Sequence, residues 1–251
     1  MSEKLRLPQV EVCREGKASQ KPLLLVAGGR QSNEMWLRGT ADSCCAVWAV
    51  DKGAGNCRDA GLIPDLFVGD KDSADRMVLQ WVVDAGVKVL EFPAEKDRTD
   101  LQLALSEAAR RFPDGRVLVT GGWGGRFDHL LSAVYSLVWS CRWGLSPWGM
   151  ADEKEVLLLL RGRGRSMLRF FELPFNLSLL SLSPRCRGVC VTGVRWELHC
   201  GKLLLDKPYA VSNKVLRNEE RKEITVEVSL DEGLLGVYLD FWSEKKNRGL
   251  S

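Results

Sequence analysis

Four aspartates stand at strand ends or helix starts, the positions where an α/β protein commonly carries its catalytic and ligand-binding residues. Asp70 and Asp72 flank a single residue directly after an apolar run, and Asp51 follows another such run. Asp100 stands at the start of a helical pattern. Clustered loop aspartates suit Mg²⁺, which takes few protein carboxylates and completes its shell with water and substrate phosphates. These residues predict a magnesium site that serves a phosphorylated substrate.

Residues 121–129 carry a second chemical signal. Four glycines within residues 121–125 directly precede a helical pattern, and glycine-rich backbone before a helix suits phosphate oxygens. Arg126 adds a phosphate-binding cation, and His129 adds a hydrogen-bond donor. The segment is not a Walker A loop, because no Gly-Lys-Ser/Thr follows the glycines. Together with the aspartates it predicts phosphoryl or diphosphoryl transfer from a nucleotide.

Each of these residues also has a plain structural interpretation. Asp70 and Asp72 can make a turn and cap a helix, and a carboxylate beside Thr99 can serve helix capping alone. A glycine-rich loop can simply turn the chain. Such explanations account for one carboxylate at a time, whereas the gathering of several at strand ends favours a metal and phosphate site.

The elements that must position these residues are strands alternating with helices. Near-continuous apolar runs predict a parallel sheet that is covered on both faces; they occupy residues 23–27, 45–50, 66–68, 87–90 and 117–120.

Helical spacing of apolar residues predicts three helices between these strands. One begins near residue 77. A second begins at Thr99, where Thr99 and Gln102 have the form of a capping box. The third begins at Asp128, which we expect to be its N-cap. Asp100 and Asp128 would then both lie at the positive end of a helix dipole.

The pattern changes after about residue 145, where short alternating segments separated by Gly, Pro and Asn predict an antiparallel β-sandwich. We therefore expect a Rossmann-like α/β domain over residues 1–150, which binds a nucleotide and magnesium and is, by the family resemblance given below, the ATP-binding catalytic domain. A β-sandwich domain over residues 151–251 would follow.

Composition narrows the function classes. The net charge of +3 is too small to favour nucleic acid or an anionic membrane as a partner. The N-terminus lacks the apolar stretch of a secretory signal, and the longest aliphatic run, residues 156–160, is too short to span a bilayer. The eight cysteines lack zinc-finger or Cys-x-x-Cys spacing, so we expect small buried thiols in a reducing cytoplasm.

The segments together resemble the thiamine pyrophosphokinase (thiamine diphosphokinase) family, in particular its bacterial form. The resemblance runs through residues 49–54, 61–73, 96–101 and 122–129 and ends on Ser212 and Asn213. It implies an N-terminal α/β domain, a C-terminal β-sandwich for thiamine binding and dimerisation, and a cytoplasmic homodimer with active sites between subunits. The implied reaction converts ATP and thiamine to thiamine diphosphate and AMP.

The resemblance also assigns roles to residues. Asp70, Asp72 and Asp100 would hold Mg²⁺ and the ATP phosphates, and Asp51 would lie at the catalytic centre with Asp72 and Asp100. The nucleotide and phosphate site would be lined by Gly122, Gly125, Arg126, Asp128 and His129. Ser212 and Asn213 would contact thiamine. Either Asp51 or Asp100 could orient the thiamine hydroxyl or accept its proton.

The chain departs from the family pattern in three places. Lys71 stands where Phe is common, and residues 130–133 lack the Asn that usually follows the Asp-His pair. The aromatic residue that covers thiamine is not assigned, and Trp196 and Trp242 are candidates. Alternative functions are a diphosphokinase acting on another alcohol such as a hydroxymethylpterin, a non-catalytic nucleotide- or thiamine-binding regulator, and a haloacid-dehalogenase-type phosphatase.

Overall fold

The computed structural model describes residues 2–16, 21–70, 75–92, 97–217 and 223–242. The protein has a mixed α/β fold with large sheets, as the sequence predicts, and it divides into two compact units. One unit is Gln20–Asp152, and the other combines Met1–Ser19 with Glu153–Ser251. Within the described ranges, no helix is both long and apolar enough to cross a membrane.

The unit Gln20–Asp152 is built on six parallel strands in the order β8-β7-β3-β4-β5-β6. Five of them are almost wholly buried, which explains their largely apolar sequences, whereas the edge strand β6 is mostly exposed. The strands are β3 (Leu23–Val26), β4 (Ala46–Val50), β5 (Leu66–Gly69), β6 (Lys88–Glu91), β7 (Arg116–Thr120) and β8 (Ser146–Ala151).

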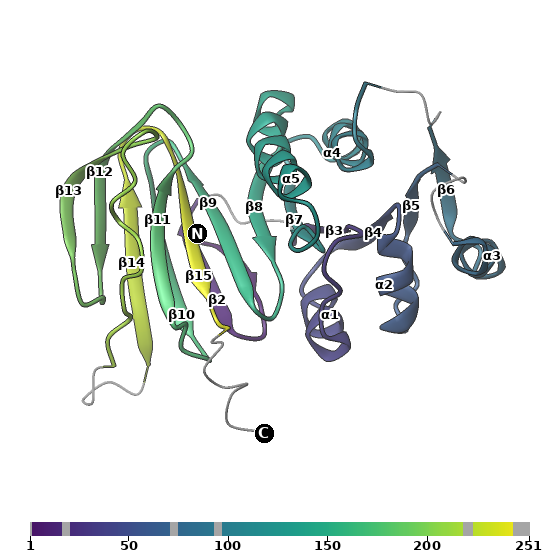
Figure 1. The fold of residues 1–251 in the computed structure, drawn as a ribbon, viewed down its shortest axis with the longest axis horizontal. Coiled ribbons are helices and arrows are strands. Elements are labelled where there is room, and N and C mark those ends of the chain that lie inside the picture. The colour runs from purple at the N-terminus through teal and green to yellow at the C-terminus, as the bar shows by residue number, and fades with distance from the viewer. Residues whose placement is uncertain (1, 17–20, 71–74, 93–96, 218–222, 243–251) are drawn as a thin grey trace. The chain divides into compact units, whose positions relative to one another are not determined.

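Helices cover both faces of this sheet (Figure 1). Helices α4 and α5 lie on one face, and α1 and α2 lie on the other. The helices are α1 (Glu34–Ala41), α2 (Gly53–Asp59), α3 (Arg76–Asp84), α4 (Asp100–Arg111) and α5 (Phe127–Ser140), followed by the short 3₁₀ helix η1 (Cys141–Trp143).

The strand order reverses at β3. The chain runs from β3 outward through β4, β5 and β6, and then returns to place β7 on the other side of β3. Loops that leave the carboxyl ends of β3 and β7 therefore turn toward opposite faces and open a crevice between them. In open α/β sheets this switch point is where ligands bind.

The other unit contains two antiparallel sheets. Six strands form one sheet in the order β1-β2-β10-β14-β12-β13, and β15 pairs with both β11 and β9 in the second. The strands are β1 (Ser2–Arg6), β2 (Val10–Glu15), β9 (Glu155–Arg161), β10 (Gly164–Phe170), β11 (Asn176–Ser181), β12 (Arg185–Thr192), β13 (Leu198–Leu204), β14 (Ile224–Leu230) and β15 (Leu234–Asp240).

Alternation in sequence decides which side chains fill the space between these sheets. In β14, Val226, Val228 and Leu230 are buried while the residues between them are partly exposed. Figure 1 shows the two sheets lying face to face within this unit.

The structure differs from the expected division at residues 1–150 and 151–251. Strands β1 and β2 belong with the C-terminal strands, because β2 pairs with β10 and β1 pairs with β2. Arg14 Nε also donates a hydrogen bond to Ser166 Oγ, 152 residues later in the chain. Local sequence patterns carry no information about a pairing of such long range.

The cysteines also differ from expectation. All eight are free thiols, but only Cys57 and Cys186 are buried, and Cys45 and Cys200 are exposed. Burial raises the pKa of Cys57 to about 12, so this thiol is inert at neutral pH. The prediction of small buried thiols holds for these two residues and is wrong for the exposed pair.

Candidate active site

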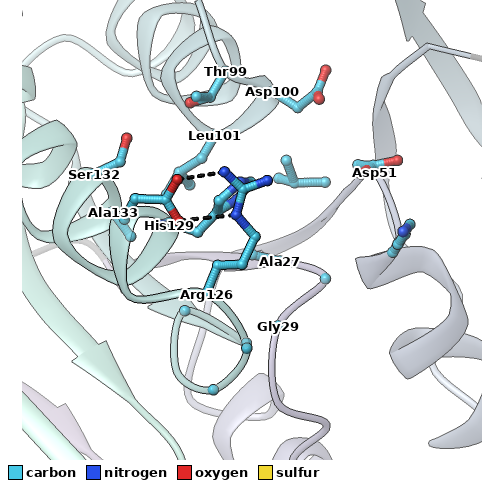
Figure 2. Close-up of a pocket in the computed structure, with 18 residues that line it drawn as sticks. Ala27, Gly29, Asp51, Thr99, Asp100, Leu101, Arg126, His129, Ser132 and Ala133 are labelled. Atoms are coloured by element: carbon cyan, nitrogen blue, oxygen red, sulfur yellow. Dashed lines mark hydrogen bonds and ion pairs between the residues drawn. The ribbon is translucent and has the colours of Figure 1, made fainter. Parts of the chain in front are cut away.

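A pocket of about 600 Å³ lies at the switch point of the parallel sheet (Figure 2). Its walls are the loops that follow β3, β4 and β7 and the first turns of α4 and α5. It is lined by Ala27, Gly28, Gly29, Val50, Asp51, Lys52, Thr99, Asp100, Leu101, Gly121, Gly122, Gly124, Gly125, Arg126, Asp128, His129, Ser132 and Ala133.

Two glycine loops are held together at the floor of this pocket. The Ala27 N–H donates to the Thr120 carbonyl and the Gly29 N–H to the Gly121 carbonyl, each at 2.8 Å. Gly121 has φ +67°, and a Cβ there would collide with the Ala27 carbonyl oxygen. Glycine is therefore required at this position both by its backbone conformation and by the close approach of the two loops.

Asp51 and Asp100 are brought to the same pocket by different elements. Asp51 follows β4, has φ +50°, and donates its backbone N–H to the Val68 carbonyl at the end of β5. Asp100 is the first residue of α4, next to the N-cap Thr99. In Figure 2 both carboxylates lie on the opposite side of the pocket from Ser132. Two predicted catalytic residues thus share one pocket.

The predicted capping box at the start of α4 is confirmed. The Gln102 N–H donates to Thr99 Oγ1 at 3.3 Å, and the Thr99 N–H donates to Gln102 Oε1 at 3.1 Å. Gln102 Nε2 also donates to Ser136 Oγ on α5 at 3.1 Å. The helix start that carries Asp100 is therefore fixed by its own cap and by a contact to the neighbouring helix.

Arg126 and Asp128 form an exposed ion pair at the start of α5. Arg126 Nη2 lies 2.5 Å from Asp128 Oδ2, and Arg126 Nε donates to Asp128 Oδ1 at 3.1 Å. The hydrogen bond from Arg126 lowers the pKa of Asp128, and Asp128 in turn raises the pKa of Arg126. Both groups are therefore charged throughout the neutral range, and their side chains are 74% and 61% exposed.

The prediction that Asp128 is the N-cap of this helix is wrong. The helix begins at Phe127, and its N-cap residue is Arg126, which makes no side-chain capping hydrogen bond. Gly124 and Gly125, both with positive φ, turn the chain just before the helix, which starts two residues earlier than the Asp pattern indicates. Asp128 instead lies in the first turn, where its Oδ1 accepts the His129 N–H at 3.0 Å.

Of the two remaining predicted metal ligands, only Asp70 lies in the described part of the chain. Asp70 follows β5 but does not line the pocket, while Lys71 and Asp72 lie outside the described residues. Gly69, next to Asp70, packs against the Asp51 backbone: a Cβ on Gly69 would lie 3.2 Å from Asp51 Cα. Across the described part of the chain, no three His, Cys, Asp or Glu side chains form a metal-binding group.

Arg30 and Asp152 were missed by sequence reasoning. Asp152 is fully buried just after β8, and its Oδ2 accepts Arg30 Nε at 2.8 Å and Arg30 Nη2 at 2.6 Å. The Arg30 N–H also donates to the Trp123 carbonyl at 2.5 Å. The backbone hydrogen bond to Trp123 fixes the chain that follows Gly28 and Gly29 against the loop of residues 121–125, and the ion pair fixes it to the buried Asp152. The sequence contained one signal for this loop: Gly28 and Gly29 directly follow an apolar strand and precede Arg30.

A smaller pocket of about 280 Å³ lies in the antiparallel unit and contains Asn213. Asn213 Nδ2 donates to the Trp196 carbonyl at 2.7 Å, and its Oδ1 accepts the Trp196 N–H at 3.1 Å. It is lined by Leu177, Leu179, Val191, Trp196, Glu197, Leu198, Tyr209, Ala210, Val211 and Asn213.

Of the two candidate aromatic residues, Trp196 lines this smaller pocket and Trp242 does not. The Trp242 ring instead lies 5.5 Å from Lys154 Nζ. Ser212, the other predicted thiamine contact, does not line the pocket but stands next to Asn213 with φ +61°. Its N–H donates to Ser178 Oγ at 3.0 Å, which anchors the segment to β11.

The chain is similar to known proteins over most of its length. A family model described as "Thiamin pyrophosphokinase, catalytic domain" matches residues 37–144. The thiamine pyrophosphokinase of Bacillus subtilis is 27% identical over 198 residues, covering 79% of this chain and 91% of that protein. The crystal structure of thiamine pyrophosphokinase from Bacillus subtilis superposes with a TM-score of 0.74 at 26% identity, covering 88% of this chain and 99% of the other.

These similarities all indicate the thiamine pyrophosphokinase family. A thiamin pyrophosphokinase from Candida albicans shares the fold, with a TM-score of 0.72 at 15% identity and coverage of 88% of this chain and 89% of that one. The family's catalytic-domain match includes Asp51, Asp100 and residues 121–129 of the large pocket. The loop after β3 and the smaller pocket lie outside the matched residues.

Proposed function

We propose that the protein transfers the diphosphate group of ATP to the hydroxyl of thiamine, giving thiamine diphosphate and AMP. The observation that carries the proposal is the pocket at the sheet's switch point, where two glycine loops, a helix N-terminus and two aspartates meet. Similarity to thiamine pyrophosphokinases supports the same reaction.

The glycine loops and Arg126 would bind the nucleotide phosphates. Glycines allow phosphate oxygens to approach backbone N–H groups closely, and the N-terminus of α5 favours negative charge. Arg126 is exposed at this helix start and can exchange its bond to Asp128 for one to a phosphate oxygen. Gly122, Gly125, Asp128 and His129 line the same space.

The carboxylates fit Mg²⁺ by their chemistry. Asp51 and Asp100 line the pocket, and Asp70 follows Gly69, which packs on the Asp51 backbone. We assign Asp70, Asp72 and Asp100 as the magnesium ligands, Asp72 on the family resemblance alone. Bound Mg²⁺ would neutralise phosphate charge as it builds up during the transfer.

The protein's own contribution is positioning and proton handling. The thiamine hydroxyl oxygen bonds to the β-phosphorus of ATP while the bond to the α-phosphate oxygen breaks, and AMP leaves. Asp51 or Asp100 would orient the hydroxyl and accept its proton. Because thiamine is a cation, the acidic residues also suit its binding.

The smaller pocket would hold thiamine. Trp196 and Tyr209 offer exposed aromatic faces for a cationic heterocycle, and Glu197 supplies a negative charge beside them. Ser212 and Asn213 shape this segment. We further propose a Rossmann-like domain and a β-sandwich domain, a cytoplasmic location, and a homodimer with active sites between subunits.

Product analysis tests the reaction. Purified protein with Mg²⁺, ATP and thiamine should form AMP and thiamine diphosphate in equal amounts. Activity only with a hydroxymethylpterin would assign the other diphosphokinase function, and binding without turnover would assign a regulator. Phosphate release that does not depend on thiamine would indicate a phosphatase.

Asp51→Asn is the sharpest variant for this test. Asn has nearly the same shape and is, like Asp, comparatively common at positive φ, so the fold should be retained. We expect kcat to fall by about 100-fold or more at an unchanged melting temperature. Asp59→Asn, an exposed aspartate on α2 outside the pocket, is the control and should keep full activity. Near-normal turnover of Asp51→Asn would remove Asp51 from the catalytic centre.

A further inference from the structure

Cys190 and Cys200 lie opposite each other on the neighbouring strands β12 and β13. Val189 pairs with Gly201, and Val191 pairs with Leu198, so one residue of β12 faces two residues of β13. This is a β-bulge: Cys190 stands on the regular strand, and His199 and Cys200 stand on the bulged one.

The sulfur of Cys190 lies directly beside the backbone of Cys200. The Cys200 N–H donates a hydrogen bond to Cys190 Sγ at 3.1 Å. Residues opposite each other in an antiparallel pair have Cα atoms about 4.5–5.5 Å apart. Disulfides span Cα separations of about 4.4–6.8 Å. The flanking pairs Val189–Gly201 and Val191–Leu198, together with the hydrogen bond from the Cys200 N–H to Cys190 Sγ, hold the two cysteines close enough for a disulfide to be tested.

The backbone at Cys200 is unusual for a cysteine. Its φ is +53°, a left-handed conformation that glycine adopts without strain and that cysteine rarely adopts. Glycine, which would adopt this conformation without strain, stands instead at the next position, Gly201. Chain geometry alone does not require a cysteine at this strained position opposite a second cysteine.

The solvent exposure of the two cysteines also favours oxidation of this pair. Cys200 is exposed and Cys190 is half-buried, so a small oxidant in solution should react with Cys200 first and with Cys190 second. The Cys190 thiol raises the pKa of Cys200 above its ordinary value, because a thiolate is disfavoured beside it. Oxidation should therefore accelerate as the pH rises above neutral.

We propose that Cys190 and Cys200 form a redox-active pair that closes reversibly into an intrachain disulfide. With glutathione disulfide as oxidant, the Cys200 thiolate attacks one glutathione sulfur and expels the other glutathione as a thiol. Cys190 then attacks Cys200 Sγ in the mixed disulfide and expels the second glutathione. Two electrons and two protons pass from the protein to two glutathione thiols.

The disulfide would close the base of the loop that leads from β12 to β13. That loop carries Trp196 and Glu197, both of which line the smaller pocket. Glu197 Oε1 already accepts the Gly193 N–H at 2.9 Å, and Arg195 and Leu216 tie the loop to the segment around Asn213 through backbone hydrogen bonds. Oxidation would thus restrain the wall of a pocket, whether or not that pocket binds thiamine.

Peptide mapping of the full chain tests the pair directly. Trypsin cuts after Arg187, Arg195 and Lys202, so Cys190 and Cys200 fall on separate peptides, residues 188–195 and 196–202. After incubation with glutathione disulfide, blocking of free thiols and digestion, mass spectrometry should find these two peptides linked. Reduction should separate them, and the thiol count of the denatured protein should fall by two and then recover.

Three single variants sharpen the result. Cys190→Ser should leave Cys200 as a stable mixed disulfide with glutathione, and Cys200→Ser should abolish the crosslink. Cys45→Ser, which removes the other exposed thiol, should leave the crosslink unchanged. The proposal is overturned if the wild-type chain gives only the Cys200–glutathione adduct, or if either cysteine pairs instead with a different cysteine. Each outcome is independent of diphosphokinase activity.

Discussion

Arg126 is the cation of the large pocket that is best placed to exchange partners. Its guanidinium pairs with Asp128, yet its side chain remains 74% exposed, so a nucleotide phosphate can reach it. We expect Arg126→Ala to lower kcat/KM for ATP about 100-fold, because a charge-assisted contact to phosphate is lost. Steady-state kinetics with varied ATP measures this loss.

Arg110→Ala is the matched control for that experiment. Arg110 is also exposed and paired with a carboxylate, Glu107, but it lies on α4 outside the pocket. Its removal should leave kcat/KM for ATP unchanged. Equal effects of the two substitutions would mean that Arg126 acts only through general surface charge.

Alanine substitutions at Gly121 and Gly86 distinguish the free-energy cost of backbone strain from the cost of a steric clash. Their φ values are +67° and +69°, but a Cβ at Gly121 meets the Ala27 carbonyl, whereas a Cβ at Gly86 meets nothing within 4 Å. We expect Gly86→Ala to cost about 1 kcal/mol of unfolding free energy and Gly121→Ala about 3 kcal/mol. Urea denaturation of both variants gives the two values. Equal losses would show that the two glycine loops are not locked together.

At the residue scale, the sequence predicted several residues that line the large pocket, but not every one. Asp51, Asp100 and Arg126 follow strand ends or begin helices, so local pattern was sufficient to find them. The Arg30–Asp152 pair joins residues 122 positions apart; Gly28 and Gly29 mark the loop before Arg30, but no local pattern predicts its partner Asp152. The capping role of Asp128 was mispredicted because two positive-φ glycines, rather than the aspartate, decide where the helix begins.

Helix α4 carries a titratable ion-pair cluster on its last turns. Glu107 accepts hydrogen bonds from Arg110 and Arg111, and these lower its pKa from 4.5 to about 2. Because the folded-state pKa lies below the unfolded one, the stabilisation is fully present above about pH 4.5. It is lost as the pH falls from 4.5 toward 2.

Glu107→Gln should reveal this dependence. We expect the variant to be about 1 kcal/mol less stable than wild type at pH 7, with the difference shrinking toward zero as the pH approaches 2. Thermal or urea unfolding across this pH range measures the difference. In an Arg110→Ala/Arg111→Ala background the pH-dependent part should disappear, and its persistence there would assign it to another group.

At the element scale, strongly patterned segments were predictable and weakly patterned ones were not. The capping box at Thr99 fixed the start of α4, and continuous apolar runs fixed β3, β4, β5 and β7. Strand β8 was missed because it contains Pro147 and Gly149, which are unusual inside a strand; its pairing with β7 shifts register there. Helices α1 and α2 are short and carry only a weak apolar stripe.

At the scale of the whole molecule, the stability of the antiparallel unit depends on the first two strands of the chain, β1 and β2. Leu5, Leu7, Val10 and Val12 are each no more than 1% exposed, and β2 pairs with β10 along five residues. We expect deletion of residues 1–16 to destabilise the antiparallel unit by on the order of 5 kcal/mol, because this apolar surface is no longer buried.

Hydrogen exchange localises the effect of that deletion. Amides of β10 should lose protection, whereas amides of β3 and β7 in the unit Gln20–Asp152 should retain it, because their partners lie within that unit. Uniform loss of protection in both units would show that they unfold as one. The long-range pairing behind this prediction is the part of the fold that sequence patterns could not supply.

The same pairing imposes an order on synthesis. The ribosome releases β1 and β2 first, but Phe170, the partner of Val10, emerges only after every strand of the parallel unit has been made. Until β10 is made, the apolar side chains of the β1–β2 hairpin stay uncovered. The unit Gln20–Asp152 by then has all its own strand partners. Nascent chains should therefore fold the unit Gln20–Asp152 first. The second unit closes last, around strands that were translated at the very beginning.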